Sequence, residues 1–167
     1  LDIGCGFAPY VERLRHLGFE CIGVDNQERF VEEGLARDLP VRTMDAHKLT
    51  FPSKSFETVL LIEVLEHVAN PEVVISEGAR VACRNVLVTV PGIDCLPYLA
   101  QFRLIPHHFL DPGHRHFYTK ATLSNLLSTI SSEVIVEDWV HFFVFQKQPL
   151  LHYHMRAEAR LDGSRQK

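Results

Sequence analysis

The first ninety residues alternate short apolar runs with stretches of helical spacing. The runs cover residues 1–3, 21–24, 41–44, 58–62 and 86–90. Short strands that recur between helices usually belong to strand–helix–strand units, whose strands pair in parallel. The pattern therefore predicts an α/β fold with a doubly wound, mostly parallel sheet.

Residue types at the ends of helical stretches predict where helices begin and end. A short helix between the first two runs should finish near Gly18, which suits a C-cap. Asn70 as N-cap and Pro71 at the first position predict a helix that runs to about Ala82. Thr119 is the predicted N-cap of a further helix.

The second half of the chain breaks the alternation. Residues 91–118 are rich in Pro, His and aromatic side chains and are long for a plain connection, which predicts an inserted binding loop. Residues 133–146 have strand composition and are expected to form two strands. We predict one domain over residues 1–148 and a polar, helical or frayed tail over 149–167. Leu1 already lies inside the first strand, so we expect that the natural N-terminus is missing.

Composition and charge narrow the classes of function. Seventeen basic and twenty-one acidic residues give a net charge of −4, which argues against a nucleic-acid partner. No run approaches the roughly 18 to 20 apolar residues that span a bilayer, and no signal peptide is evident. The four cysteines form no CxxC pair, so we expect them to be reduced in a cytoplasmic protein. The oligomeric state stays open.

A glycine turn follows the first apolar run directly, in Leu1-Asp2-Ile3-Gly4-Cys5-Gly6. Glycines there let the backbone turn tightly and let a ligand approach closely. Asp25 ends the next strand, where a carboxylate can accept hydrogen bonds from ribose hydroxyls. Pro9 stands where a dinucleotide fingerprint needs its third glycine, so the pattern favours an adenosine-containing cofactor without a pyrophosphate.

Four segments in this order resemble the class I S-adenosylmethionine-dependent methyltransferases. They are the glycine turn, Cys21-Ile22-Gly23-Val24-Asp25, Met44-Asp45-Ala46, and FPSKSFETVLLIEVLEHV over residues 51–68. The last segment is similar to that of quinone-biosynthesis and other small-molecule methyltransferases. The resemblance implies a Rossmann-like seven-stranded sheet with one antiparallel strand and helices on both faces. It also implies methyl transfer from S-adenosylmethionine to a small molecule.

The resemblance further implies a set of cofactor contacts. Asp25 would bind the ribose hydroxyls, Asp45 would accept from the adenine amino group, and the Ala46 N–H would donate to the ring. The residues expected at the cofactor are Asp2, Gly4, Cys5, Gly6, Asp25, Asn26, Asp45, Ala46, Ile62 and Glu63.

Displacement at a sulfonium needs positioning and exclusion of water more than a covalent nucleophile. An oxygen or nitrogen acceptor can still require a base, and we name His107, His108 and His114 of the inserted loop as candidates. The alternatives are that these histidines only brace the loop, or bind a divalent metal with Asp111. We predict no metal, and the loop's apolar side chains favour an aromatic, quinone-like or lipid-like acceptor.

Two rival functions stay open from the sequence. One is a non-catalytic methyltransferase-like module with a regulatory or scaffolding role. The other is a nucleotide-dependent oxidoreductase. The identity of the acceptor and the methylated atom, whether oxygen, nitrogen or carbon, cannot be read from these residues.

Overall fold

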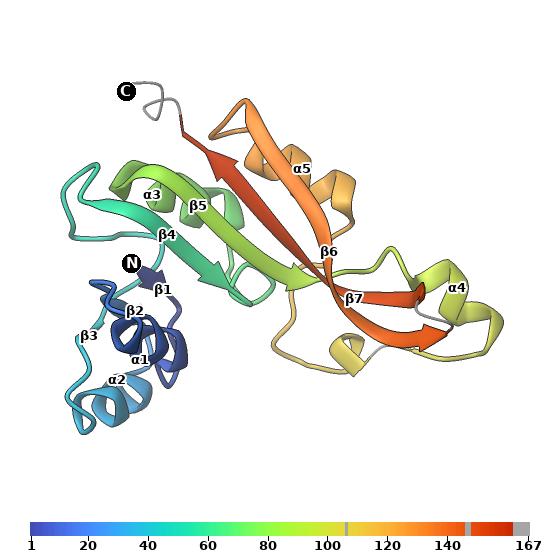
Figure 1. Cartoon of the computed structure of the whole chain (residues 1–167), viewed down its shortest axis with the longest axis horizontal. Coiled ribbons are helices and arrows are strands. Elements are labelled where there is room, and N and C mark those ends of the chain that lie inside the picture. The colour runs from blue at the N-terminus through green and yellow to red at the C-terminus, as the bar shows by residue number, and fades with distance from the viewer. Residues whose placement is uncertain (106, 146–147, 162–167) are drawn as a thin grey trace.

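The computed structural model describes residues 1–105, 107–145 and 148–161, and its centre is one seven-stranded sheet. The strands are β1 (Asp2–Ile3), β2 (Gly23–Asp25), β3 (Val41–Thr43), β4 (Phe56–Ile62), β5 (Ala82–Pro91), β6 (Glu133–Phe145) and β7 (Gln148–Arg160). Their order is β3-β2-β1-β4-β5-β7-β6, as Figure 1 shows. All pairs are parallel except those of β7, which runs antiparallel to β5 and β6. The predicted fold class is confirmed.

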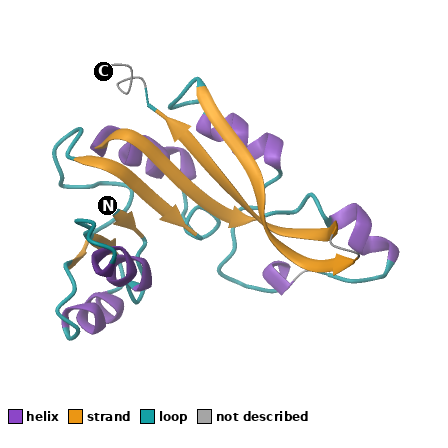
Figure 2. Ribbon diagram, viewed as in Figure 1, coloured by secondary structure: helices purple, strands orange, loops and turns teal. Residues whose placement is uncertain are grey.

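Helices connect the strands and cover the sheet. They are α1 (Pro9–His16), α2 (Glu28–Leu35), α3 (Pro71–Val81), α4 (Leu96–Gln101), α5 (Lys120–Leu127) and a 3₁₀ turn at His107–Phe109. Figure 2 shows α3 and α5 together behind the long strands, whereas α1 and α2 gather at the short strands. None of the described helices has the length and apolar character needed to cross a bilayer.

Alternation along the strands divides the core between the two faces of the sheet. Ile3 is in register with Val24 and Leu61, and all three belong to the fully buried cluster that also contains Val74 and Ile75 of α3. Successive residues point to opposite faces, so Gly23 faces the other way. A Cβ at Gly23 would lie 2.7 Å from Cys5 Sγ and 2.8 Å from Val11 Cγ2, which shows how closely α1 packs on β2.

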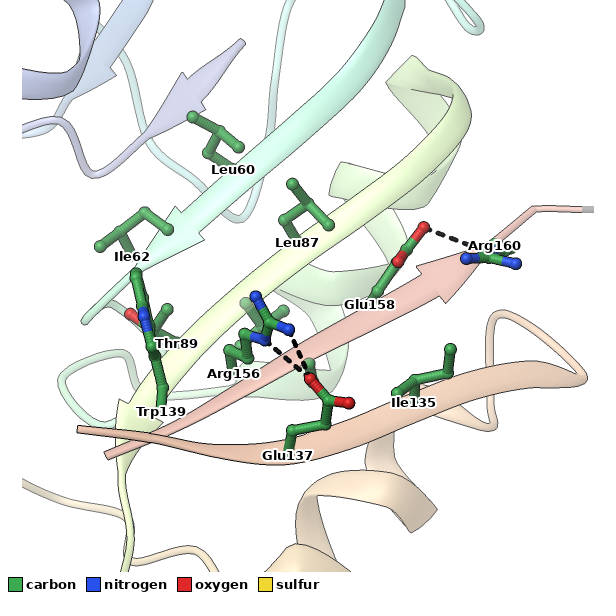
Figure 3. A pocket seen from close by; sticks show the side chains of 12 residues that line it. Leu60, Ile62, Leu87, Thr89, Ile135, Glu137, Trp139, Arg156, Glu158 and Arg160 are labelled. Carbon is green, nitrogen blue, oxygen red and sulfur yellow. Dashed lines mark hydrogen bonds and ion pairs between the residues drawn. The ribbon is translucent and has the colours of Figure 1, made fainter. Parts of the chain in front are cut away.

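The face covered by α1 and α2 continues beyond them as a hollow of about 430 Å³ over β4, β5, β7 and β6. Figure 3 shows Leu60, Ile62 and Leu87 in this hollow, together with Trp139. Arg156 binds Glu137 across its floor, with 2.6 Å between Arg156 Nη2 and Glu137 Oε2.

Two sequence predictions about the end of the chain are wrong. The segment 149–167 is not helical or frayed as far as residue 160, because Gln148–Arg160 form β7 inside the sheet; residues 162–167 lie outside the described residues. Glu133–Phe145 form one strand, not two. The tail prediction was wrong because buried Met155, Ala157 and Ala159 alternate with charged residues along β7. The charged residues, arginines among them, are typical of a solvated tail.

The inserted loop is anchored at both ends. The Ile93 N–H donates to the Tyr118 carbonyl at 2.9 Å, and Gly92 bridges to Tyr118. Tyr118 is buried, and its hydroxyl donates to the Leu65 carbonyl at 3.2 Å. The loop between these anchors, which contains α4 and the 3₁₀ turn, therefore starts and finishes beside the segment that follows β4.

Candidate functional site

A pocket of about 640 Å³ opens at the carboxyl ends of the parallel strands. Ligands of open α/β sheets bind at this edge, and the volume lies within the usual range for small-molecule sites. Seven predicted residues line it, namely Gly4, Gly6, Asp25, Asn26, Asp45, Ala46 and Glu63. Most of the cofactor residues predicted from the sequence therefore lie around one pocket.

The glycine turn leaves its backbone bare. Gly4 and Gly6 have φ of +70° and +51°, in the left-handed region that favours glycine. A Cβ at Gly4 would lie 2.6 Å from Val64 Cγ2, so a larger residue does not fit between the turn and the segment after β4. A ligand can thus approach the turn without meeting a side chain from it.

Asp25 ties this turn to the end of β2. Its Oδ2 accepts a hydrogen bond from the Gly6 N–H at 2.9 Å, and its Oδ1 accepts from the Gln27 N–H at 2.9 Å. The residue is 8% exposed. Each carboxylate oxygen has a second lone pair, so the group can still accept from a ligand hydroxyl.

Asp45 supplies the second carboxylate, from the turn after β3. Its Oδ1 accepts from the His47 backbone N–H at 2.9 Å and pairs with His47 Nδ1 at 2.8 Å. These two hydrogen bonds, the backbone one first, hold the pKa of Asp45 below its usual value. The carboxylate is therefore ionised at neutral pH and can act only as an acceptor.

The inserted loop forms the far wall. Pro112, Gly113 and Arg115 line the pocket together with His67, whose Nδ1 is 3.1 Å from the Gly113 carbonyl. Asp111 Oδ1 accepts from the Gly113 N–H at 2.8 Å. Asp25, Asp45 and Asp111 thus each accept from the N–H two residues on, so three loops around one pocket are closed by Asx turns.

Glu63 directly follows β4 and has a left-handed conformation, with φ of 55°. Thr89 Oγ1 donates to its Oε1 at 2.7 Å, and its Oε2 lies 2.9 Å from His154 Nε2 on β7. A side chain held in an unfavourable backbone region by two neighbouring strands is typical of a binding or catalytic site.

Three predicted cofactor residues do not line this pocket. Asp2 is 1% exposed, and burial raises its pKa to about 7. Cys5 is buried under β2, where its side chain packs against Gly23. Ile62 lines the hollow on the sheet face instead (Figure 3). Contacts of these three residues with a ligand stay predictions.

The three candidate bases are placed less favourably. His107 lies in the 3₁₀ turn, and its side chain is outside the described part of the structure. His108 is buried at 1% exposure, and His114 Nε2 lies 3.7 Å from Asp111 Oδ2. Neither lines the pocket. A base among them stays a prediction.

One cluster could hold a metal ion in the described part of the chain. Glu66, His67 and His114 offer ligand atoms within 4.8 Å of one another. Glu66 is 1% exposed, and burial, with smaller contributions from Glu63 and Asp111, raises its pKa to about 8. The absence of a metal at this cluster stays a prediction.

Several lining residues were not predicted, above all Phe30, His47, His67 and Arg115. Only His47 had a local signal, because a side chain two residues after an aspartate turn can reach back to it. His67 and Gly113 are 46 residues apart, and no spacing rule connects them.

Solved structures show which known fold this chain adopts. A SAM-dependent methyltransferase from Archaeoglobus fulgidus superposes with a TM-score of 0.76, at 18% identity, over 95% of this chain and 84% of that chain. Magnesium protoporphyrin IX methyltransferase from Synechocystis PCC 6803, solved with bound SAH, gives a TM-score of 0.66, at 21% identity, over 96% of this chain and 73% of that chain. The fold is that of the Rossmann-like methyltransferases.

The sequence places the chain in a family. Residues 1–90 of the 167 match the family model described as a methyltransferase domain, and the chain belongs to this family. The ubiquinone biosynthesis O-methyltransferase of Azoarcus sp. (strain BH72) is 34% identical over 90 residues. That match covers 49% of this chain and 38% of the relative, so the chain spans less than two fifths of the relative's length.

Proposed function

We propose that this domain binds S-adenosylmethionine in the 640 Å³ pocket and transfers its methyl group to a small-molecule acceptor. The observation that carries the proposal is the Asp25 carboxylate, which binds the Gly6 N–H in the same pocket that Asp45 lines. One acid at the end of β2 and one in the turn after the neighbouring β3, beside a bare glycine turn, suit an adenosyl group. A scaffolding module would have no need of this arrangement.

The residues present fit the cofactor. Asp25 would accept from the ribose hydroxyls, while Asp45 and the Ala46 N–H would bind adenine. A side chain at Gly4 would collide with Val64, whereas a Cβ built at Gly6 meets nothing within 4 Å, so the turn leaves open space for a ligand at Gly6. The proposed set also contains Glu63, Asn26, the buried Asp2 and Cys5, and the partly exposed Ile62. The carboxylates among them favour a cationic ligand.

The cofactor supplies an activated methyl group, so the protein mainly has to orient the acceptor and exclude water. The inserted loop, whose Pro112, Gly113 and Arg115 form the far wall, would border the acceptor. His107, His108 and His114 of this loop are the proposed source of a base.

For the acceptor, we propose only a chemical class. The names of the relatives, a ubiquinone biosynthesis enzyme and a magnesium protoporphyrin methyltransferase, support a ring-containing, largely apolar molecule. Four cysteines without disulfides are compatible with action in the cytoplasm.

Calorimetry with S-adenosylhomocysteine tests the cofactor part of the proposal. The wild-type protein should show saturable heat, and Asp25→Asn should weaken binding about 10- to 100-fold, since it removes a charged acceptor. Asp38→Asn is the matched control, because Asp38 is exposed and does not line the pocket. Absence of saturable heat from a folded wild-type protein would refute the proposal.

The acceptor can be sought directly. The protein would be incubated with isotope-labelled S-adenosylmethionine and an extract of host metabolites, and mass spectrometry would identify the molecule that gains the methyl group. Label that appears equally in the Asp25→Asn sample would show that the transfer comes from another source.

A further inference from the structure

The contact between Asp45 and His47 concentrates two hydrogen bonds on one carboxylate oxygen. Asp45 Oδ1 accepts the His47 backbone N–H at 2.9 Å and lies 2.8 Å from the ring Nδ1. Because the carboxylate is ionised, the ring nitrogen must be the donor. His47 therefore engages Oδ1 only and leaves Oδ2 able to accept from another group.

His47 is itself part of the pocket wall, beside Ala46 and Met44. Its side chain is 27% exposed, whereas that of Asp45 is 63% exposed. The other ring nitrogen, Nε2, is shielded from solvent and has no hydrogen-bond partner among the described residues. The contact with Asp45 is thus the polar interaction that orients the ring in the part of the chain that the structure describes.

The ring contact is not required by the turn. Asp25 and Asp111 close the same kind of Asx turn with the backbone N–H of Gln27 and Gly113. Gly113 has no side chain to donate, and the Gln27 side chain makes no bond to Asp25 in the described structure. The hydrogen bond from the imidazole is therefore additional to the backbone hydrogen bond that closes the turn. Its effect is to restrict rotation of the exposed Asp45 carboxylate about its Cβ–Cγ bond.

We propose that His47 is a positioning residue that fixes the Asp45 carboxylate for recognition of adenine, so that the site prefers adenine over hypoxanthine. The inference rests on the proposed function and adds a determinant of specificity to it. Adenine presents an amino donor to Asp45 Oδ2. Hypoxanthine presents a carbonyl at the same position, and a fixed carboxylate would face its lone pairs.

Two substitutions at His47 separate the ring donor from the bulk of the side chain. His47→Asn keeps an N–H at the position of Nδ1, whereas His47→Leu has a similar branch point and no donor. Both keep the backbone N–H that closes the turn. Each protein would be titrated by calorimetry with S-adenosylhomocysteine and with S-inosylhomocysteine, and thermal melting would verify that it is folded.

The wild-type and His47→Asn proteins should bind the adenosyl ligand within about twofold of each other and discriminate equally against the inosyl ligand. His47→Leu should bind the adenosyl ligand about tenfold more weakly and lose a similar factor of discrimination. Unchanged discrimination in a folded His47→Leu protein would overturn the inference, whatever its affinity. A wild-type protein that binds neither ligand would instead refute the proposed function, and the inference with it.

Discussion

At the scale of single residues, burial strongly changes the protonation of the Glu66 carboxyl. It is almost completely buried after β4, and its carboxyl oxygens receive no well-aligned hydrogen bond from the described residues. Burial therefore raises its pKa from 4.5 to about 8. The folded protein binds a proton at Glu66 that the unfolded chain releases at a much lower pH.

This difference predicts how stability depends on pH. Because the pKa of Glu66 is higher in the folded state, its contribution is fully present below pH 4.5 and is lost as pH rises toward 8. Glu66→Gln mimics the protonated form without titrating. The free energy of unfolding of this variant should exceed that of wild type by an amount that grows between pH 5 and 8, by at most about 1.4 kcal/mol per pH unit.

Urea denaturation of both proteins across that pH range measures the effect. Asp2, whose pKa is also raised, is present in both proteins, so its contribution cancels in the difference. A difference that stays constant from pH 5 to 8 would mean that Glu66 has an ordinary pKa in the folded protein.

At the scale of elements, the caps of α3 and α5 look alike in sequence and differ in the structure. Thr119 Oγ1 accepts from the Thr122 N–H at 3.1 Å, and Thr122 Oγ1 accepts from the Thr119 N–H at 2.8 Å, which completes a capping box. Asn70 stands at the N-cap of α3, as predicted, but its side chain makes no capping hydrogen bond.

Thr119→Ala should therefore lower stability by about 1 kcal/mol, with a fall in Tm of about 2–4 °C. Asn70→Ala, the matched change at the other helix, should have a clearly smaller effect. Differential scanning calorimetry of the two variants gives both values. Equal losses of stability in the two variants would show that the hydrogen bonds of the capping box add no stability.

The same elements show what sequence patterns can and cannot predict. Asn70 and Thr119 marked the starts of two helices correctly because capping depends on neighbours within one turn. The patterns did not mark α2, because its N-cap is Gln27 and its C-cap is Ala36, so neither end carries the usual capping residue. Local sequence motifs were enough to predict that Gly4, Gly6, Asp25 and Asp45 lie in one pocket. The far wall of the pocket could not be predicted in this way, because it depends on tertiary contacts.

At the scale of the whole molecule, β7 joins the edge strand β6 to the rest of the sheet. It lies between β5 and β6, and β6 pairs with no other strand in the described structure. Met155, Ala157 and Ala159 of β7 belong to the main hydrophobic cluster. This placement could not be predicted from composition, because charged residues fill the alternate positions.

A chain that ends at residue 148 should therefore lose cooperative unfolding, since the truncation removes an inner strand and leaves β6 without a partner. A chain that ends at Leu161 retains every described strand and should unfold cooperatively. Circular dichroism during thermal unfolding distinguishes the two. A sharp transition in the shorter chain would show that the first five strands form a stable unit alone.

The three Asx turns around the pocket bear on the energetics of ligand capture. Asp25, Asp45 and Asp111 each bind an N–H group of their own loop without any contribution from a ligand. Little conformational entropy is then left to lose when a ligand arrives, and more of the contact energy remains as affinity. The loops are preorganised, and two of the carboxylates that close them, Asp25 and Asp45, are also the ones proposed to recognise the ligand.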